Sequence, residues 1–152
     1  MKKLATGDNV AGDGITTGKY LGTEKMYGRS FHKVFDKTKQ MIVYFPFEEI
    51  RRIRRLPSKS TMLRSLNIFD NNFILDDGKI EGSRYKYYKE KLKDVSFKST
   101  VEILHDVNML VKNKKASVAE RKMYHLLKDK VLNEVSYVLA LSLEEIENQY
   151  LN

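Results

Sequence analysis

The chain has 152 residues and a formal net charge of +8, from 28 Lys and Arg against 20 Asp and Glu. That length fits one domain or two small ones, and 41% hydrophobic residues are too many for a disordered chain. The lack of cysteine excludes disulfides, and no apolar run reaches the ~20 residues of a membrane-spanning helix. No apolar signal segment follows Lys2 and Lys3, so we expect a cytoplasmic protein without a membrane association.

The charge is unevenly distributed along the chain. Residues 1–57 hold 12 basic and 6 acidic residues, and residues 80–130 hold 13 and 7. Residues 131–152 hold four glutamates and no base. A positive field on the N-terminal half and the middle favours a polyanionic partner there, and the C-terminus would repel phosphate.

The first third of the sequence predicts short β-strands. Six of the eight glycines fall in residues 1–28, between strand-like runs. The best runs are Gly18–Gly22, Phe31–Phe35 and Met41–Phe45. Asp36–Gln40 is typical of a hairpin loop, and Pro46 ends the third run because proline cannot donate to a sheet. Strands this short and this closely spaced predict a small, strongly bent sheet or barrel.

After Pro57 the pattern changes to helix. Residues 60–69 predict a short helix, and three Ser-x-x-Glu sequences, at Ser99, Ser117 and Ser142, match the capping box that begins a helix. Apolar residues then recur at helical spacing. We therefore expect an α+β protein with a β domain over residues 1–57 and a domain of four or five helices over 58–152.

The sequence offers little for catalysis. His32, His105 and His125 lie far apart and lack the spacing of a helical metal pair. Asp77-x-Lys79 has the arrangement of a metal-dependent nuclease, but Asp77-Gly78 is a turn signal in its own right. No glycine-rich phosphate loop is present. We expect no enzyme, no metal and no cofactor, and the nuclease remains a remote alternative.

Basic clusters carry more information. Residues 51–55 hold four arginines, residues 84–93 interleave bases with three tyrosines, and residues 112–122 place bases beside the Ser117 cap. Bases near a helix N-terminus suit phosphate, since free N–H groups and the helix dipole favour anions. The candidate DNA-binding residues are Arg84, Lys86, Lys89, Lys91, Arg121 and Lys122.

The order of several short motifs resembles the CarD/CdnL family of bacterial transcription regulators over roughly residues 4–140. The motifs are Gly7-Asp8-x-Val10, Phe45-Pro-x-Glu48, Arg84-Tyr-Lys86, Glu90-Lys-Leu92 and Ser117-x-x-Glu-Arg-Lys-Met123. The resemblance implies a Tudor-like β domain that binds the β subunit of RNA polymerase. It also implies a helical domain that contacts double-stranded promoter DNA just upstream of the −10 element and favours the open complex.

Several family positions differ in this chain. A tryptophan that wedges into the minor groove is replaced by Glu81, and Ile80 or Tyr85 could substitute for it. Two arginines of the polymerase contact are replaced by Glu24 and Tyr44. The usual Tyr-Pro-x-x-Gly after the first strand is replaced by residues 12–14. The candidate polymerase-binding residues are Lys25, Arg29, Tyr44 and Phe45. We expect a monomer, and an adaptor that holds polymerase without touching DNA is the main alternative.

Overall fold

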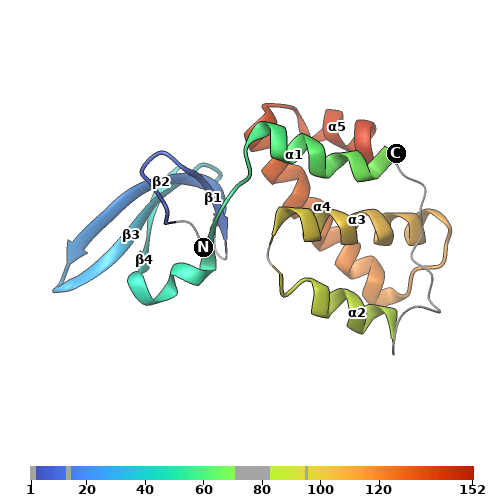
Figure 1. Ribbon diagram of the computed structural model, residues 1–152, viewed down its shortest axis with the longest axis horizontal. Helices are drawn as coiled ribbons and strands as arrows, with labels where there is room; N and C mark the ends of the chain where they lie inside the picture. Colours follow the sequence, from blue (N-terminus) through green and yellow to red (C-terminus); the bar gives the residue numbers. More distant parts are fainter. Residues whose placement is uncertain (1–2, 13–14, 71–82, 95) are drawn as a thin grey trace. The chain divides into compact units, whose positions relative to one another are not determined.

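The computed structural model describes residues 3–12, 15–70, 83–94 and 96–152, and it confirms the α+β class. The chain divides into two compact units between Leu56 and Pro57, beside the boundary expected near residue 57. We call residues 1–56 the β unit and residues 57–152 the helical unit. Figure 1 shows the strands in the first unit and the α-helices in the second.

The β unit is an antiparallel sheet with the strand order β4-β3-β2-β1-β5. Its strands are β1 (Asn9–Gly12), β2 (Ile15–Met26), β3 (Arg29–Asp36), β4 (Met41–Pro46) and β5 (Ile53–Arg55). A 3-10 helix, η1 (Phe47–Arg52), joins β4 to β5. Residues 53–55 of the arginine cluster at 51–55 therefore belong to a strand. No described residues pair β4 with β5, so the two are the edges of an open ladder.

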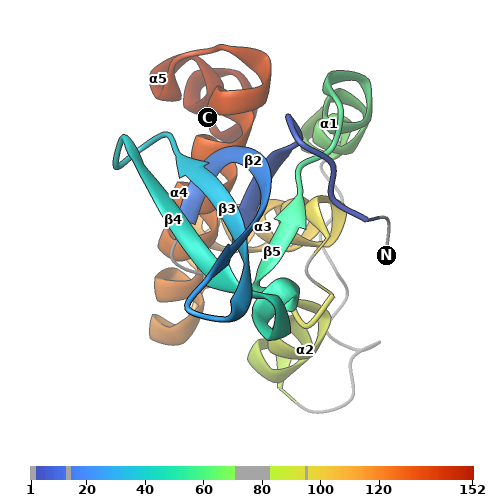
Figure 2. The same cartoon turned by 90° about the vertical axis from the view of Figure 1, so that its left-hand side faces the viewer.

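Glycines bend β2 instead of breaking it. The sequence predicts that Gly22 ends a strand, but β2 runs through it to Met26. The pairing with β3 shifts register between Tyr20 and Gly22, and Gly22 has a φ of +105°, which an L side chain rarely adopts. At Gly18 a Cβ would lie 2.3 Å from the Phe35 carbonyl oxygen. The strand bends here, and it pairs with β3 on one edge and with β1 on the other (Figure 2).

A small core and one tight turn complete the β unit. The core residues are Val10, Ile15, Tyr20, Val34, Phe45 and Ile53. The β2–β3 hairpin turns at Tyr27 and Gly28, which have φ values of 52° and 73°. Two positive φ values in succession match the twist of the flanking strands. Asp36 is fully buried, and its carboxylate accepts the backbone N–H groups of Thr38 and Lys39 in the loop that precedes β4.

The helical unit begins with α1 and a short 3-10 turn, followed by four more α-helices and a π-helical turn. The bounds are α1 (Lys59–Leu66), η2 (Asn67–Asp70), α2 (Arg84–Lys91), α3 (Phe97–Lys112), α4 (Val118–Leu139), α5 (Leu143–Ile146) and η4 (Glu147–Leu151). Within the described residues, no helix is both long enough and apolar enough to cross a bilayer.

Serine caps every α-helix that the structure describes. The capping residues are Ser58, Ser83, Ser96, Ser117 and Ser142. Each hydroxyl accepts a backbone N–H of the first turn, which would otherwise lack a partner. The capping box predicted at Ser117 is present in full. The one predicted at Ser99 is wrong, because α3 begins three residues earlier and Ser99 instead donates to Asp94, at 2.9 Å.

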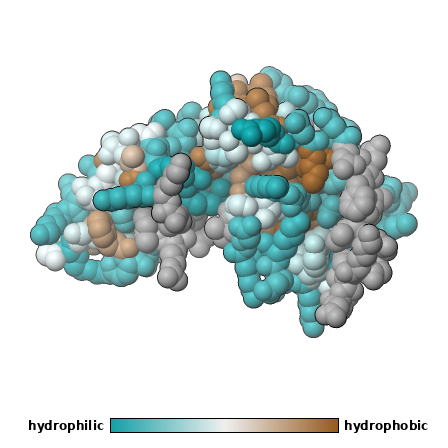
Figure 3. Space-filling model, in the orientation of Figure 1, coloured by the Kyte–Doolittle hydropathy of each residue, from teal (hydrophilic) through white to brown (hydrophobic). Residues whose placement is uncertain are grey.

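A single apolar core holds the helices together. In Figure 1, α3 lies between α1 and α2, with α4 crossing behind it. α3 supplies the largest share of the core, and its inner face is almost fully buried. Met62 and Leu66 come from α1, Tyr88 from α2, and α4 adds Leu127 and Val135, among others. Figure 3 shows that some apolar side chains still reach the surface on the face in view.

Candidate functional site

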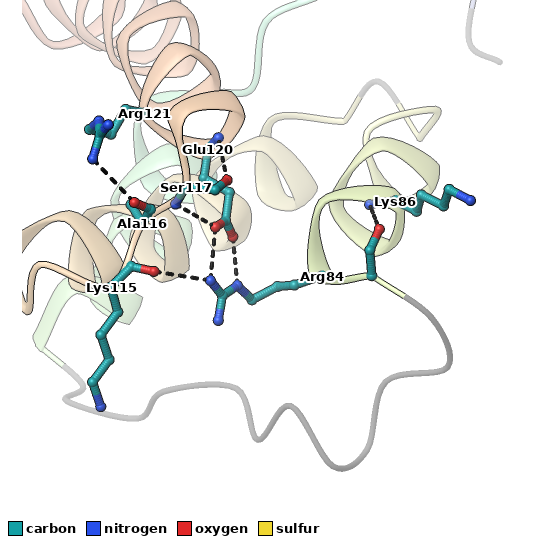
Figure 4. A network of polar contacts seen from close by, with 8 residues as sticks. Arg84, Lys86, Lys115, Ala116, Ser117, Glu120 and Arg121 are labelled. Atoms are coloured by element: carbon teal, nitrogen blue, oxygen red, sulfur yellow. Dashed lines mark hydrogen bonds and ion pairs between the residues drawn. The ribbon is translucent and has the colours of Figure 1, made fainter.

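Arg84 and Glu120 form a clamp between α2 and the start of α4 (Figure 4). The Arg84 guanidinium donates through Nε to Glu120 Oε2 at 2.6 Å and through Nη2 to Glu120 Oε1 at 2.8 Å. Nη2 also donates to the Lys115 carbonyl oxygen, at 3.2 Å. The Glu120 side chain is 2% exposed and accepts the Ser117 backbone N–H as well. Two parallel hydrogen bonds to one carboxylate make this the strongest kind of ion pair.

The clamp sets the charge state of Glu120. The hydrogen bonds from Arg84 lower the pKa of this carboxyl from 4.5 to about 2, against the opposing effect of burial, and the bonds from Ser117 add to the lowering. Glu120 is therefore ionised across the physiological range. Arg84 was predicted to contact DNA, but its guanidinium is engaged with Glu120 and Lys115. Its role in the structure is to position α2 against α4.

Lys91 is also engaged within the fold. Its ammonium lies 2.9 Å from a carboxylate oxygen of Glu102 on α3. Burial disfavours the charged lysine, but the hydrogen bond and charge of Glu102 outweigh it and raise the pKa of Lys91. Of the six residues predicted to bind DNA, Lys91 and Arg84 thus hold α2 in place.

The other four predicted residues are exposed cations, on α2 and α4. The Lys86 side chain points away from the clamp (Figure 4). The Arg121 guanidinium turns back to the Ala116 carbonyl oxygen at 3.3 Å. Lys89 lies over the Tyr85 ring, 5.6 Å from its centroid. In the part of the chain that the structure describes, no carboxylate forms an ion pair with Lys86, Lys89 or Lys122.

A groove of about 680 Å³ separates the outer sides of α2 and α4. We call it the α2–α4 groove. Its lining is Tyr85, Lys89, Leu92, Val118, Ala119, Lys122, Met123, Leu126 and Leu127. Seven of these nine residues bring carbon surface or an aromatic ring, and the two lysines are the charged members. The sequence analysis singled out the two lysines but not the apolar groove, because the groove forms only where α2 packs beside α4.

On the β unit, three of the four predicted polymerase-binding residues are exposed: Lys25, Arg29 and Tyr44. Arg29 forms an ion pair with Glu48 in which both side chains are more than half exposed. Phe45 is 5% exposed and belongs to the core. Its side chain is not part of the surface, and we leave it out of the proposed interface.

The two positions that replace the family arginines lie together. The Tyr44 hydroxyl forms a hydrogen bond with the Glu24 carboxylate, and this bond raises the pKa of Tyr44. Lys33, which pairs with Tyr44 across β3 and β4, lies 3.9 Å from the same carboxylate. This chain thus carries a small mixed-charge cluster at this place on the sheet.

The exposed apolar side chains of β4 were not singled out from the sequence. Met41 is 52% exposed and Ile42 is 42% exposed. They belong to a run that predicts a strand, but alternation alone does not tell which strand lies at the edge of a sheet.

The histidines show no catalytic grouping. His32 is buried against Tyr20 and Phe47, His105 is buried beside Asp106, and His125 is exposed. Within the described residues, no group of three or more potential metal ligands occurs. The proposed nuclease residues Asp77 and Lys79, and the wedge position Glu81, lie outside the described residues.

Comparison with known families gives one match. The model of the CarD C-terminal domain matches residues 62–151, which is more than half of the chain and lies within the helical unit. No individual curated protein matches the chain significantly. The CarD family is a regulatory, non-enzymatic family of transcription-related proteins. The helical unit is its C-terminal domain, and the chain belongs to the CarD family.

Proposed function

We propose that this protein is a transcription regulator that holds the β subunit of RNA polymerase with its β unit and upstream promoter DNA with its helical unit, and thereby favours the open complex. One observation carries the proposal: each unit presents a surface of the kind its partner needs. The β unit has an open, apolar edge strand, and the helical unit has exposed cations on α2 and α4.

The polymerase contact is supported by the edge of the sheet. β4 pairs with β3 alone among the described strands, so its other side can accept a strand from a partner. Backbone hydrogen bonds would give such a contact its affinity, and side chains its selectivity. Exposed Met41, Ile42 and Tyr44 provide apolar and aromatic contacts along that strand. The β unit shows apolar side chains on its surface in Figure 3.

The DNA contact is supported by the four predicted cations that form no ion pair with a carboxylate in the described chain. Exposed Lys86, Lys89, Arg121 and Lys122 suit contacts to phosphate, which fix position without reading sequence. Because Glu81 stands where the family carries its wedge tryptophan, the proposal relies on tethering: polymerase holds the helical unit close to upstream DNA, and weak phosphate contacts then suffice.

The polymerase half of the proposal is tested with the full chain and purified polymerase. Lys25→Glu and Tyr44→Ala should weaken binding to the β subunit, measured by interferometry at fixed salt. The matched control is Lys98→Glu, which changes the charge equally at an exposed site of the helical unit. Equal loss in Lys98→Glu and Lys25→Glu would show that net charge, and not this surface, determines binding.

The DNA half is tested by the salt dependence of binding to duplex DNA. Each phosphate contact releases counterions, so Lys86→Ala and Arg121→Ala should each flatten the slope of log affinity against log salt by about one contact. Lys25→Ala serves as the control in the β unit. If the wild-type protein shows no salt-dependent DNA binding at all, the adaptor without DNA contact is the correct function.

A further inference from the structure

The α2–α4 groove has an apolar lining that the proposed function does not use. Leu126 is 73% exposed and Val118 is 61% exposed, and both lie on α4 with Lys122 between them. The three residues are spaced four apart, so they form one row along consecutive turns of the helix. Apolar side chains this exposed, in one row beside an open groove, indicate an interaction surface rather than a core.

The lining distinguishes between possible ligands. A phosphate backbone would find only two cations, Lys89 and Lys122, and otherwise aliphatic carbon. A small molecule would leave much of Leu126 and Val118 in water, whereas pockets for small ligands enclose most of the ligand surface. A helix laid between α2 and α4 would cover both side chains and contact the groove along its length.

We propose that the α2–α4 groove binds an amphipathic α-helix of a protein partner, with acidic residues beside its apolar stripe. Charge complementarity selects the acidic partner. The groove carries Lys89 from α2 and Lys122 from α4, and no carboxylate is among its lining residues. Neither ammonium has an ion-pair partner in the described chain, so each can form an ion pair with a carboxylate of the partner helix.

The row on α4 limits the length of the contact. From Val118 to Leu126 the helix rises roughly 12 Å, which matches about two turns of a partner helix. Such a helix would present apolar residues at positions i, i+3, i+4 and i+7, the pattern of helices that bind in apolar grooves. The acidic residues would flank this stripe, where they meet Lys89 on one side and Lys122 on the other.

The experiment uses the full chain and two designed helical peptides of about four turns. Both carry leucine at i, i+3, i+4 and i+7, and the flanking positions are glutamate in one peptide and lysine in the other. Binding is followed by amide chemical shifts and by anisotropy of a labelled peptide. We expect the glutamate peptide to bind, with shifts at residues of the α2–α4 groove, and the lysine peptide to bind at least tenfold more weakly.

Neutral variants separate this site from the DNA contact. Leu126→Ser and Val118→Ser should each weaken the binding of the glutamate peptide about tenfold, because each removes apolar area that the peptide would cover. Neither substitution should change the salt dependence of DNA binding. Leu63→Ser, at an exposed leucine of α1 outside the groove, is the matched control. Absence of shifts at about 1 mM peptide, equal binding of both peptides, or unchanged binding by Leu126→Ser would overturn the proposal.

Discussion

Each unit contains a buried polar pair, and the two pairs differ in charge. In the helical unit, an ionised carboxylate is held by an arginine, at Glu120 and Arg84, and supports the placement of a whole helix. In the β unit, the pair is neutral: the Tyr20 hydroxyl lies 2.6 Å from His32 Nδ1, and Phe47 stacks on the imidazole. A charged pair binds strongly but depends on both ionisations, whereas a neutral pair fails once its histidine takes up a proton.

The two units also differ in how many of their basic side chains form ion pairs. The first 57 residues have the larger excess of bases, yet Arg29, Lys33 and Arg55 each lie within ion-pair distance of a carboxylate. In the helical unit, Lys86, Lys89 and Lys122 have no such partner in the described chain. A basic composition therefore does not identify the basic surface.

The largest effect is expected from Glu120→Gln, which breaks the charged clamp. The shift of the Glu120 pKa from 4.5 to about 2 corresponds to roughly 3 kcal/mol of stability at neutral pH, and the variant should lose about that much unfolding free energy. Urea denaturation followed by helical circular dichroism measures it. Glu102→Gln, which removes the partner of the more exposed Lys91, should cost less than about 1 kcal/mol. Equal losses would mean that the clamp is no stronger than an ordinary surface pair.

Much of the fold can be predicted from the sequence, because its signals are local. Serine caps and apolar periodicity indicate most helices, and β-type runs indicate β2, β3 and β4. β1 and β5 are too short for alternation to show, and Ser96 is as good a cap as Ser99 by composition alone.

The site is harder to predict than the fold, because it depends on pairs distant in sequence. Arg84 and Glu120 lie 36 residues apart, and nothing in the motif around either residue indicates that they meet. The cations of 84–93 therefore looked equivalent, although two of them hold the fold together. Phe45 is another example, since a strand pattern does not tell which of two alternating faces is buried.

Acid should affect the β unit first. Burial lowers the pKa of His32 below 6.5. Below pH 6.5 the unfolded chain therefore binds a proton that the folded β unit does not readily take up, and the β unit becomes less stable as the pH decreases. The stability that Glu120 contributes to the helical unit is lost only between about pH 4.5 and about pH 2. Intensities of folded-state amide signals, followed in the full chain from neutral pH to about pH 3, should therefore decline earlier for the β unit. Simultaneous loss in both units would contradict separate proton linkage.

Tyr20→Phe sharpens the same contrast by removing one hydrogen bond. His32 Nδ1 would remain buried without its hydrogen-bond partner, which costs about 1–2 kcal/mol. If Nδ1 of the neutral ring accepts this hydrogen bond, the loss of the Tyr20 hydroxyl should also raise the pKa of His32, which an NMR titration of the imidazole protons reports. Tyr27→Phe, at a side chain that is 96% exposed, should change neither quantity. A His32 pKa that stays unchanged in Tyr20→Phe would show that burial alone lowers it.

The smallest effect on stability, and the most informative one for function, is expected at the Arg29–Glu48 ion pair. Both side chains are more than half exposed, so Arg29→Gln and Glu48→Gln should leave the unfolding midpoint unchanged. Their effects on polymerase binding should have opposite signs. Arg29→Gln removes a cation from the proposed interface and should weaken binding severalfold, whereas Glu48→Gln releases the guanidinium from its competing carboxylate and should strengthen it. Arg64→Gln, at an exposed arginine of α1, controls for the change in net charge. Weakening by both variants would mean that the ion pair itself, and not the free guanidinium, is what polymerase recognises.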